Sequence, residues 1–373
     1  MTERVTIPQG RYLWAIKRAG STIDDYAEAH PKVPIREWVD GGKLPTVKQL
    51  EAFANSVNVP FGFLFLDDEP SESVPIPFFR GDAGSRWRFD LDVYDSVINI
   101  KRRQEWLEEY LSENDIEQCR LVGSVSASTN VAEAVSLLHE FLCLDEGWRS
   151  GLASAEAGVA EFTRALEQAG VFVAYNGVVG NNTHRPLKVS ECRGFSLVSE
   201  FAPYIFVNSA DATTAQLFTL AHEAAHLMLG VSAGHGEADT PATDDTERYC
   251  DAVAAEFLVP SSELQSSWTG DIKLSARKFL VSEVVIARRA HDLGLMSDDS
   301  YKSFWDDYSR RPKPMRKRGS GGSFYRTSVK RVGLTFAIHV RNAVASRQLS
   351  YTDAFRLTGL HGKTYYHFMN VVI

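Results

Sequence analysis

The pattern of apolar and polar positions divides the chain into a helical first part and a mixed second part. Within residues 10–66, short stretches with apolar residues three and four apart alternate with Gly, Pro and Ser residues that interrupt helices. This pattern indicates a small helical bundle of the helix-turn-helix type. Thr46 follows a proline and is expected to cap the last of these helices. The apolar face of that helix consists of Leu50, Phe53, Ala54 and Val57.

Helical patterns continue after a Pro- and Ser-rich segment at residues 69–77, and a group of short β-rich runs interrupts them. Because these runs are short and alternate with loops, they fit a small sheet beside helices and not a doubly wound parallel sheet. The fold class is therefore predicted as α+β and mostly helical. The helical patterns cover 92–111, 131–142 and 155–170, and the β-rich runs are VFVAYN, GFSLVSE and YIFVN at 171–176, 194–200 and 204–208.

Four regions follow from these patterns. Residues 1–70 form the helix-turn-helix-like domain, and residues 71–150 form a helical linking region. Residues 151–308 contain the β-rich runs and further helices, and residues 309–373 form a basic linker with a small helical unit. Within the last region, residues 310–323 are rich in Pro, Gly and basic residues, which is typical of a flexible linker.

Composition places the protein among soluble globular proteins, with 44% hydrophobic and 24% charged residues over 373 positions. No apolar run is long enough for a membrane helix, and the first residues lack the apolar run of a signal peptide. We therefore expect a cytoplasmic protein with no membrane partner. The four cysteines are scattered without a Cys-x-x-Cys pair, which argues against a disulfide framework and against a thiolate zinc site.

Charge is distributed unevenly along the chain. From Ser309 onward, thirteen Arg and Lys residues face one Asp, a net charge of +12, so the preceding residues sum to −20 in a chain of net charge −8. This basic segment is expected to contact nucleic acid, an acidic partner or the acidic body itself, or simply to be solvated. The first 70 residues carry eight basic and ten acidic residues, and this net charge of −2 favours protein docking over duplex DNA binding.

The strongest chemical signal lies in FTLAHEAAHLMLG, residues 218–230, where two histidines stand four apart within an apolar run. On a helix, His222 and His226 project from one face and can bind one metal ion, while Glu223 lies about 100° round the helix beside it. This arrangement suits zinc hydrolysis, in which imidazoles hold the metal and the carboxylate takes a proton from water. The alternative is a buried helix with histidines by chance, although buried imidazoles need hydrogen-bond partners.

A catalytic zinc ion needs a third protein ligand, and the next helical pattern, residues 244–260, contains candidates. Glu247 and Asp251 share a face, so Glu247 can bind the ion while Asp251 hydrogen-bonds the free nitrogen of a ligating histidine. An ordinary acidic helix start is the alternative, because Asp244 and Asp245 also favour the helix dipole. The position of this helix shortly after the two histidines favours the ligand interpretation.

These motifs, with the segments around them, resemble the ImmA/IrrE family of metallopeptidases. The segments that carry the metal-site resemblance are RGFSLVSEFAPYIFVN (193–208), DATTAQLFTLAHEAAHLMLG (211–230) and ERYCDAVAAEFLVP (247–260). PTVKQLEAFANSVNVPFGFLFL (45–66) looks like the helix-turn-helix region often fused ahead of that domain, and residues 274–297 look like the helical segment that follows it. Cys250, with Ala252 and Val253, departs from the family pattern at packing positions, which affects the chemistry little.

The resemblance implies that residues 151–308 form a small zincin-type metallopeptidase domain, in which a short sheet packs on two active-site helices. It implies a bound zinc ion, Zn2+, with His222, His226 and Glu247 as ligands and Glu223 as the catalytic base. It also implies a family role: cleavage of a helix-turn-helix regulator or antitoxin, expected to be encoded nearby, that switches genes in response to phage, mobile elements or stress.

Three questions stay open at the level of sequence. The donor that stabilises the tetrahedral oxyanion could be Tyr249, Arg193, His184 or His235, each of which is as well explained as a surface or structural residue. The YIFVN run could be an edge strand for an extended peptide substrate or an ordinary core strand. The protein could also be a transcriptional regulator or toxin–antitoxin component whose peptidase fold senses or binds without cutting.

Overall fold

A computed structural model describes residues 4–70, 76, 78–79, 91–235, 245–311 and 324–371. The chain divides into two compact units, Met1–Val74 and Pro75–Ile373. Within the described residues, none of the helices has both the length and the apolar character that a membrane span requires.

The first unit is a bundle of short helices around one aromatic core. Tyr12, Trp38 and Phe53 pack with ring centroids 5.6–6.3 Å apart. Thr46 caps α4 as predicted, because its hydroxyl accepts a hydrogen bond from the backbone N–H of Gln49. The helical character of this region is confirmed, while its helix-turn-helix character stays a prediction. Its helices are α1 (Gln9–Arg18), α2 (Ile23–Ala29), α3 (Ile35–Val39), α4 (Val47–Ser56) and the 3-10 helix η1 (Phe61–Phe65).

The second unit is built around a five-stranded sheet with the strand order β1-β7-β5-β6-β2. β5 is antiparallel to both β6 and β7, whereas β2 is parallel to β6 and β1 is parallel to β7. The predicted β-rich runs form β2, β5 and β6, and a separate hairpin of β3 and β4 follows β2. The strands are β1 (Phe78–Phe79), β2 (Phe172–Tyr175), β3 (Val178–Val179), β4 (Asn182–Pro186), β5 (Gly194–Leu197), β6 (Tyr204–Val207) and β7 (Ala233–His235).

The YIFVN run forms β6, which lies inside the sheet between β5 and β2. The expectation that this run forms an edge strand for substrate is therefore wrong, and the core-strand alternative holds. Both sides of β6 are hydrogen-bonded to neighbours, and Tyr204, Ile205 and Val207 are completely buried. A continuous apolar run of this kind is typical of a strand that is covered on both faces.

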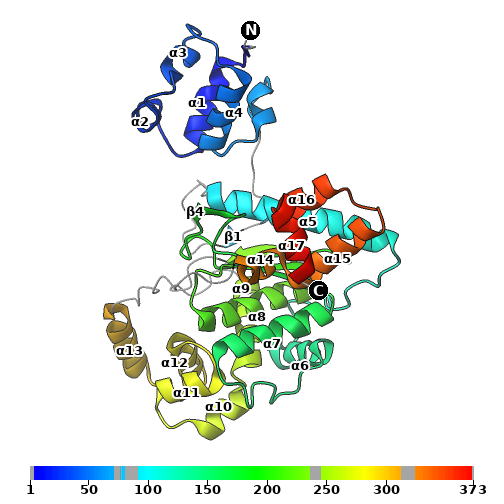
Figure 1. The fold of residues 1–373 in the computed structure, drawn as a ribbon. Coiled ribbons are helices and arrows are strands. Elements are labelled where there is room, and N and C mark those ends of the chain that lie inside the picture. Colours follow the sequence, from blue (N-terminus) through cyan, green and yellow to red (C-terminus); the bar gives the residue numbers. More distant parts are fainter. Residues whose placement is uncertain are drawn as a thin grey trace. The chain divides into compact units, whose positions relative to one another are not determined.

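Helices cover both faces of the sheet (Figure 1). On one face, α7 and α8 pack against the strands, and Ile205 and Val207 join Leu220 in one core. On the other face lie α5, α14 and α15. There the ring of Phe336 on α15 packs edge-on against that of Tyr204 on β6, with the ring centroids 6.5 Å apart. The helices are α5 (Leu91–Glu113), α6 (Val131–Leu142), α7 (Ala155–Gln168), α8 (Thr213–Leu229), α9 (Asp245–Leu258), α10 (Ser261–Ser267), α11 (Ile272–Phe279), α12 (Glu283–Asp292), α13 (Asp298–Arg310), α14 (Phe324–Val332), α15 (Leu334–Ala345), α16 (Tyr351–Thr358) and α17 (Gly362–Val371).

The basic C-terminal helices pack directly on the sheet. Gly333, at φ +90°, brings the start of α15 so close to β2 that an added Cβ would lie 2.8 Å from the carbonyl oxygen of Val173. The hydroxyl of Tyr204 donates to the carbonyl of Val332 at 3.3 Å. These helices therefore form part of the cover of the sheet, although residues 312–323 of the expected linker lie outside the described residues. The expected domain boundaries at residues 150 and 308 stay predictions.

Candidate metal centre

The helix that carries the two histidines, α8, is buried along nearly its whole length. It packs against β5 and β6 and against the neighbouring helices α7 and α9. Gly230 ends the helix in a left-handed conformation at φ +71°, which a glycine adopts without strain. His222, Glu223 and His226 are at most 1% exposed. Because buried polar groups need partners, the surroundings of these three side chains decide between a metal site and chance.

Three side chains from two helices converge at one point. His222 and His226 of α8 turn their Nε2 atoms towards each other, 3.1 Å apart. Glu247 of α9 approaches both of them, with its Oε1 2.9 Å from Nε2 of His226 and its Oε2 3.3 Å from Nε2 of His222. Each residue offers a ligand atom to this group, and all three residues are buried.

The spacing and chemistry of this group fit a divalent metal ion. Zinc binds histidine nitrogen and carboxylate oxygen at about 2.0–2.2 Å, so two ligands in a tetrahedral site lie roughly 3.3 Å apart. Nε2 of His226 lies 3.1 Å from Nε2 of His222 and 2.9 Å from Oε1 of Glu247, and both distances are close to this spacing. The other carboxylate oxygen of Glu247 lies 3.3 Å from Nε2 of His222. Two nitrogens and a carboxylate match the ligand preferences of zinc, and a third imidazole or a thiolate is not required.

Asp251 lies one helical turn beyond Glu247 and holds the other side of the His222 ring. Its Oδ1 lies 3.0 Å from Nδ1 of His222, which leaves Nε2 pointing at the cluster. Burial would lower the pKa of His222, but the hydrogen bonds with Asp251 and Glu247 outweigh it and raise the pKa to about 10. The carboxylates of Asp251 and Glu247 thus strongly favour a positive charge at this buried site.

Glu223 lies on the side of α8 that faces the sheet. Burial, with a contribution from the charge of Glu247, raises its pKa to about 8, while the charge of His222 and the hydroxyl of Ser196 partly oppose this shift. Gly194, at the start of β5, lies against it: an added Cβ would be 3.5 Å from Oε1 of Glu223 and 2.5 Å from the methyl group of Thr219. The carboxylate therefore lies in a closely packed space between α8 and β5.

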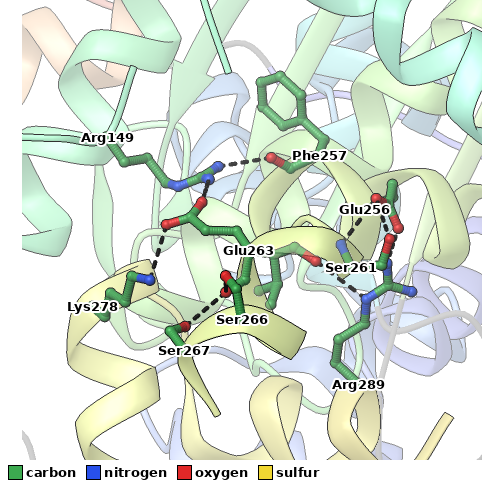
Figure 2. A network of polar contacts seen from close by, with 10 residues as sticks. Arg149, Glu256, Phe257, Ser261, Glu263, Ser266, Ser267, Lys278 and Arg289 are labelled. Atoms are coloured by element: carbon green, nitrogen blue, oxygen red, sulfur yellow. Dashed lines mark hydrogen bonds and ion pairs between the residues drawn. The ribbon is translucent and has the colours of Figure 1, made fainter. Parts of the chain in front are cut away.

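Charged side chains anchor the C-terminal end of α9, the helix that carries Glu247 (Figure 2). The guanidinium of Arg149 donates to the carbonyl of Phe257 at 2.7 Å and lies 3.5 Å from Glu263. Arg289 of α12 pairs with Glu256 and donates to the carbonyl of Val259 at 3.2 Å. Cations beside the last carbonyls of a helix stabilise that end. This network holds α9 in position against the helices that follow it.

The four candidate oxyanion donors lie in different surroundings. Arg193 pairs with Asp211 at 3.4 Å, and His184 is exposed on β4. Burial raises the pKa of Tyr249, and the charge of Glu133 on α6 adds to this effect. The backbone of His235, in β7, pairs with that of Gly194, in β5. The side chain of His235 lies outside the described part of the structure. The structure thus brings the three expected ligands together, and the identity of the oxyanion donor stays a prediction.

Sequence reasoning missed several side chains around the site. Gly194 and Ser196 line the space beside Glu223, and a glycine inside a strand pattern is a known sign of close approach by another group. No sequence pattern indicated the roles of Arg149 and Arg289. Each donates to a backbone carbonyl at or near the end of α9 that is far from it in the sequence.

Fold and site together define a class. A short sheet packs on α8, α9 packs on α8, and the facing side chains of the two helices form a His-Glu-x-x-His and Glu constellation, as in zinc-dependent metallopeptidases. Comparison with family models agrees, because residues 167–291 match the IrrE N-terminal-like domain of peptidase family M78. This segment runs from the last two residues of α7 to α12, contains the candidate metal centre and is similar to the ImmA/IrrE family over about a third of the chain. Residues 332–370 match a domain of unknown function, DUF8813. Comparisons with curated proteins and with solved structures give no match.

Proposed function

We propose that this protein is a zinc-dependent endopeptidase that cleaves a helix-turn-helix regulator or an antitoxin encoded nearby, and so controls gene expression. The observation that carries the proposal is the convergence of His222, His226 and Glu247, with Glu223 buried beside them. The match of residues 167–291 to a peptidase family supports the reaction class. The regulatory substrate rests on the family resemblance of the sequence.

In this proposal, His222, His226 and Glu247 hold the zinc ion, and Asp251 keeps the ring of His222 in the orientation that directs Nε2 at it. When bound, zinc acts as a Lewis acid towards a carbonyl group and lowers the pKa of a water to about 7. Glu223 takes a proton from the attacking water and delivers it to the nitrogen that leaves the cleaved peptide bond. The position of Glu223 supports this role, because it is buried next to the two histidines on α8 and a base must lie within reach of the proton that it takes.

A non-catalytic role is the alternative. The N-terminal unit has its own core, and the C-terminal helices carry a basic surface, as a regulator that only senses or binds would need. The intact set of ligands and base favours the peptidase, because binding alone requires no buried carboxylate beside the histidines.

The test combines metal analysis with cleavage. Purified protein should contain about one zinc per chain, and the His222→Ala, His226→Ala double variant should contain little. The wild-type protein should cut the regulator encoded beside its gene, and the double variant should leave it intact. Full zinc content in the double variant would refute the assigned ligands. Zinc binding without cleavage of any candidate regulator would favour the sensing alternative.

A further inference from the structure

Two helices of the C-terminal segment are joined in the manner of a helix-turn-helix motif. α16 ends at Gly359, which is left-handed at φ +67°, and α17 begins three residues later at Gly362. A short turn that contains glycine between two helices, the second of which enters the major groove, is typical of this motif. The side chain of Asn181, in the β3–β4 hairpin, donates to the carbonyl of Gly359 at 2.9 Å and fixes the turn to the sheet unit.

Aromatic side chains between the two helices make this motif a packed structure. The ring of Phe355 on α16 meets that of Tyr365 on α17 at 5.0 Å, in an edge-to-face arrangement. Phe368 is completely buried, and Leu360, in the turn, is 3% exposed. Such packing fixes the orientation of α17 relative to α16, because buried aromatic contacts dominate the energetics of small cores.

The outer face of α17 carries hydrogen-bond donors and lacks carboxylates. Lys363, Tyr366, His367 and Asn370 are exposed, and their spacing of three, four and seven places them on one side of the helix. The opposite side, with Tyr365, is buried. Lysine and asparagine are side chains that recognise guanine and adenine at their major-groove edges, and tyrosine and lysine bind phosphates.

The net charge of the segment that contains these two helices has the sign that a nucleic acid requires. Residues 324–371 contain seven Arg and Lys residues and one Asp, a net charge of +6, in a chain whose residues before Ser309 sum to −20. At physiological salt the screening length is about 8 Å, so the local charge of this segment matters more than the net charge of the chain. The N-terminal bundle, with a net charge of −2 over the first 70 residues, lacks this property.

We propose that α16 and α17 form a helix-turn-helix element that binds duplex DNA, with α17 in the major groove. Lys363 and Asn370 contact the DNA from the exposed face of α17. The element is part of the same unit as the candidate metal centre, so the DNA would bring this centre to proteins that are bound nearby. The proposal does not depend on zinc or on proteolysis.

The test measures binding of full-length protein to a fluorescent duplex of mixed sequence, about three helical turns long, by anisotropy over a salt series. The wild-type dissociation constant should be on the order of 10⁻⁴ to 10⁻⁶ M at physiological salt, and affinity should fall steeply as salt rises. The Lys363→Ala, Asn370→Ala variant should bind at least about tenfold more weakly, with a salt slope reduced by about one.

A matched control removes more charge at a different place. Lys273 of α11 and Lys302 of α13 are exposed, and the Lys273→Ala, Lys302→Ala variant should bind DNA as the wild type does. An equal loss in both variants, or no salt-dependent binding by the wild type, would overturn the proposal. Competition by polyglutamate as effective as that by unlabelled duplex would also overturn it and would assign the surface to an acidic protein. Melting curves of both variants should match the wild type, because the substituted residues are exposed.

Discussion

Glu223 and the two histidines share one helix but have different proposed roles, and an amide substitution distinguishes them. The Glu223→Gln variant should bind zinc as the wild type does, because the proposed ligands His222, His226 and Glu247 are unchanged. Its rate of peptide cleavage should fall by about 100-fold or more, since an amide cannot accept the proton of the attacking water. Zinc content and cleavage rate are measured on the same preparation. A cleavage rate equal to that of the wild type would remove Glu223 from the mechanism.

Gly194 is the residue whose small size allows β5 to lie against the candidate metal helix. In the Gly194→Ala variant, the new Cβ would be 2.5 Å from the methyl of Thr219 and 2.8 Å from the carbonyl oxygen of Phe206. We expect a loss of about 1–3 kcal/mol in the free energy of unfolding, as for other overpacked cores. Urea unfolding measures this loss. Gly147→Ala is the control, because its Cβ would meet only a side-chain oxygen of Asp145 at 3.5 Å.

The sequence predicted the members of this site unevenly. His222, His226 and Glu223 could be proposed from spacing alone, because helix geometry relates residues one turn apart. The pair of Glu247 and Asp251 needed the nearby motif as context. The environment of Glu223 could not be predicted, because the approach of β5 to α8 depends on contacts between segments that are distant in sequence.

At the scale of elements, the anchoring of α9 depends on Arg149. Its side chain is 6% exposed and donates to the carbonyl of Phe257. The Arg149→Met variant should retain the apolar packing of the stem but leave this buried carbonyl without its charged donor, a loss of about 1–3 kcal/mol. Lys278→Met is the control, because Lys278 pairs with the same Glu263 but its side chain is about two-fifths exposed. The loss in the free energy of unfolding should therefore stay below about 1 kcal/mol. Similar losses in chemical unfolding would contradict a special role for Arg149.

The contact between α7 and α15 should make stability depend on pH. Glu167 of α7 accepts a hydrogen bond from the backbone N–H of Thr335 at 3.5 Å, and burial raises its pKa above the usual value. A raised pKa in the folded protein means that stability is highest below the unfolded pKa, about 4.3, and declines as pH rises through the folded pKa. The Glu167→Gln variant lacks this decline, so its melting temperature relative to wild type should increase from pH 4 towards neutral pH.

A control on the same helix has the opposite sign. The hydrogen bond from Arg164 lowers the pKa of Glu161, so its contribution is present above the unfolded pKa and is lost as pH falls. The Glu161→Gln variant should therefore lose stability at neutral pH relative to acid, by a small amount because the pair is at the surface. Equal pH profiles for the two variants would show that the burial of Glu167 is unimportant.

Elements with strong periodicity were predictable, and short ones were not. The helices at 92–111, 131–142 and 155–170 correspond to α5, α6 and α7. β7 and β1 gave no sequence signal, because two or three residues are too few for an alternating pattern and their pairing depends on a distant partner. The same reason made the position of YIFVN within the sheet unpredictable: an apolar run indicates burial but does not identify its neighbours.

At the scale of the whole molecule, the two ends of the chain should differ in their importance for folding. Deletion of residues 310–373 removes Phe336 and the neighbours that cover Phe172 and Tyr204 on the sheet. Burial of each large aromatic side chain contributes about 1.5–3 kcal/mol, against a total stability of about 5–15 kcal/mol. We expect this truncated protein to aggregate or to lose zinc.

Deletion of residues 1–70 is the matched truncation. That segment forms a core of its own around Tyr12 and Phe53, so the second unit should melt within a few degrees of the full-length protein and keep its zinc. Calorimetry and metal analysis of both truncated proteins test the two expectations together. A folded, zinc-loaded protein without residues 310–373 would show that the C-terminal helices are dispensable for the sheet.

Because the proposed ligands are divided between α8 and α9, a bound metal would affect the stability of the fold as well as the chemistry of the site. An ion held by His222, His226 and Glu247 cross-links two helices, as a disulfide joins two cysteines, but the link opens and closes with the supply of zinc. By mass action, free zinc at 100 times its dissociation constant adds about 2.7 kcal/mol to stability. The amount of intact protein in a cell would then follow zinc availability, so scarcity of the ion would reduce the enzyme by degradation as well as by inactivation.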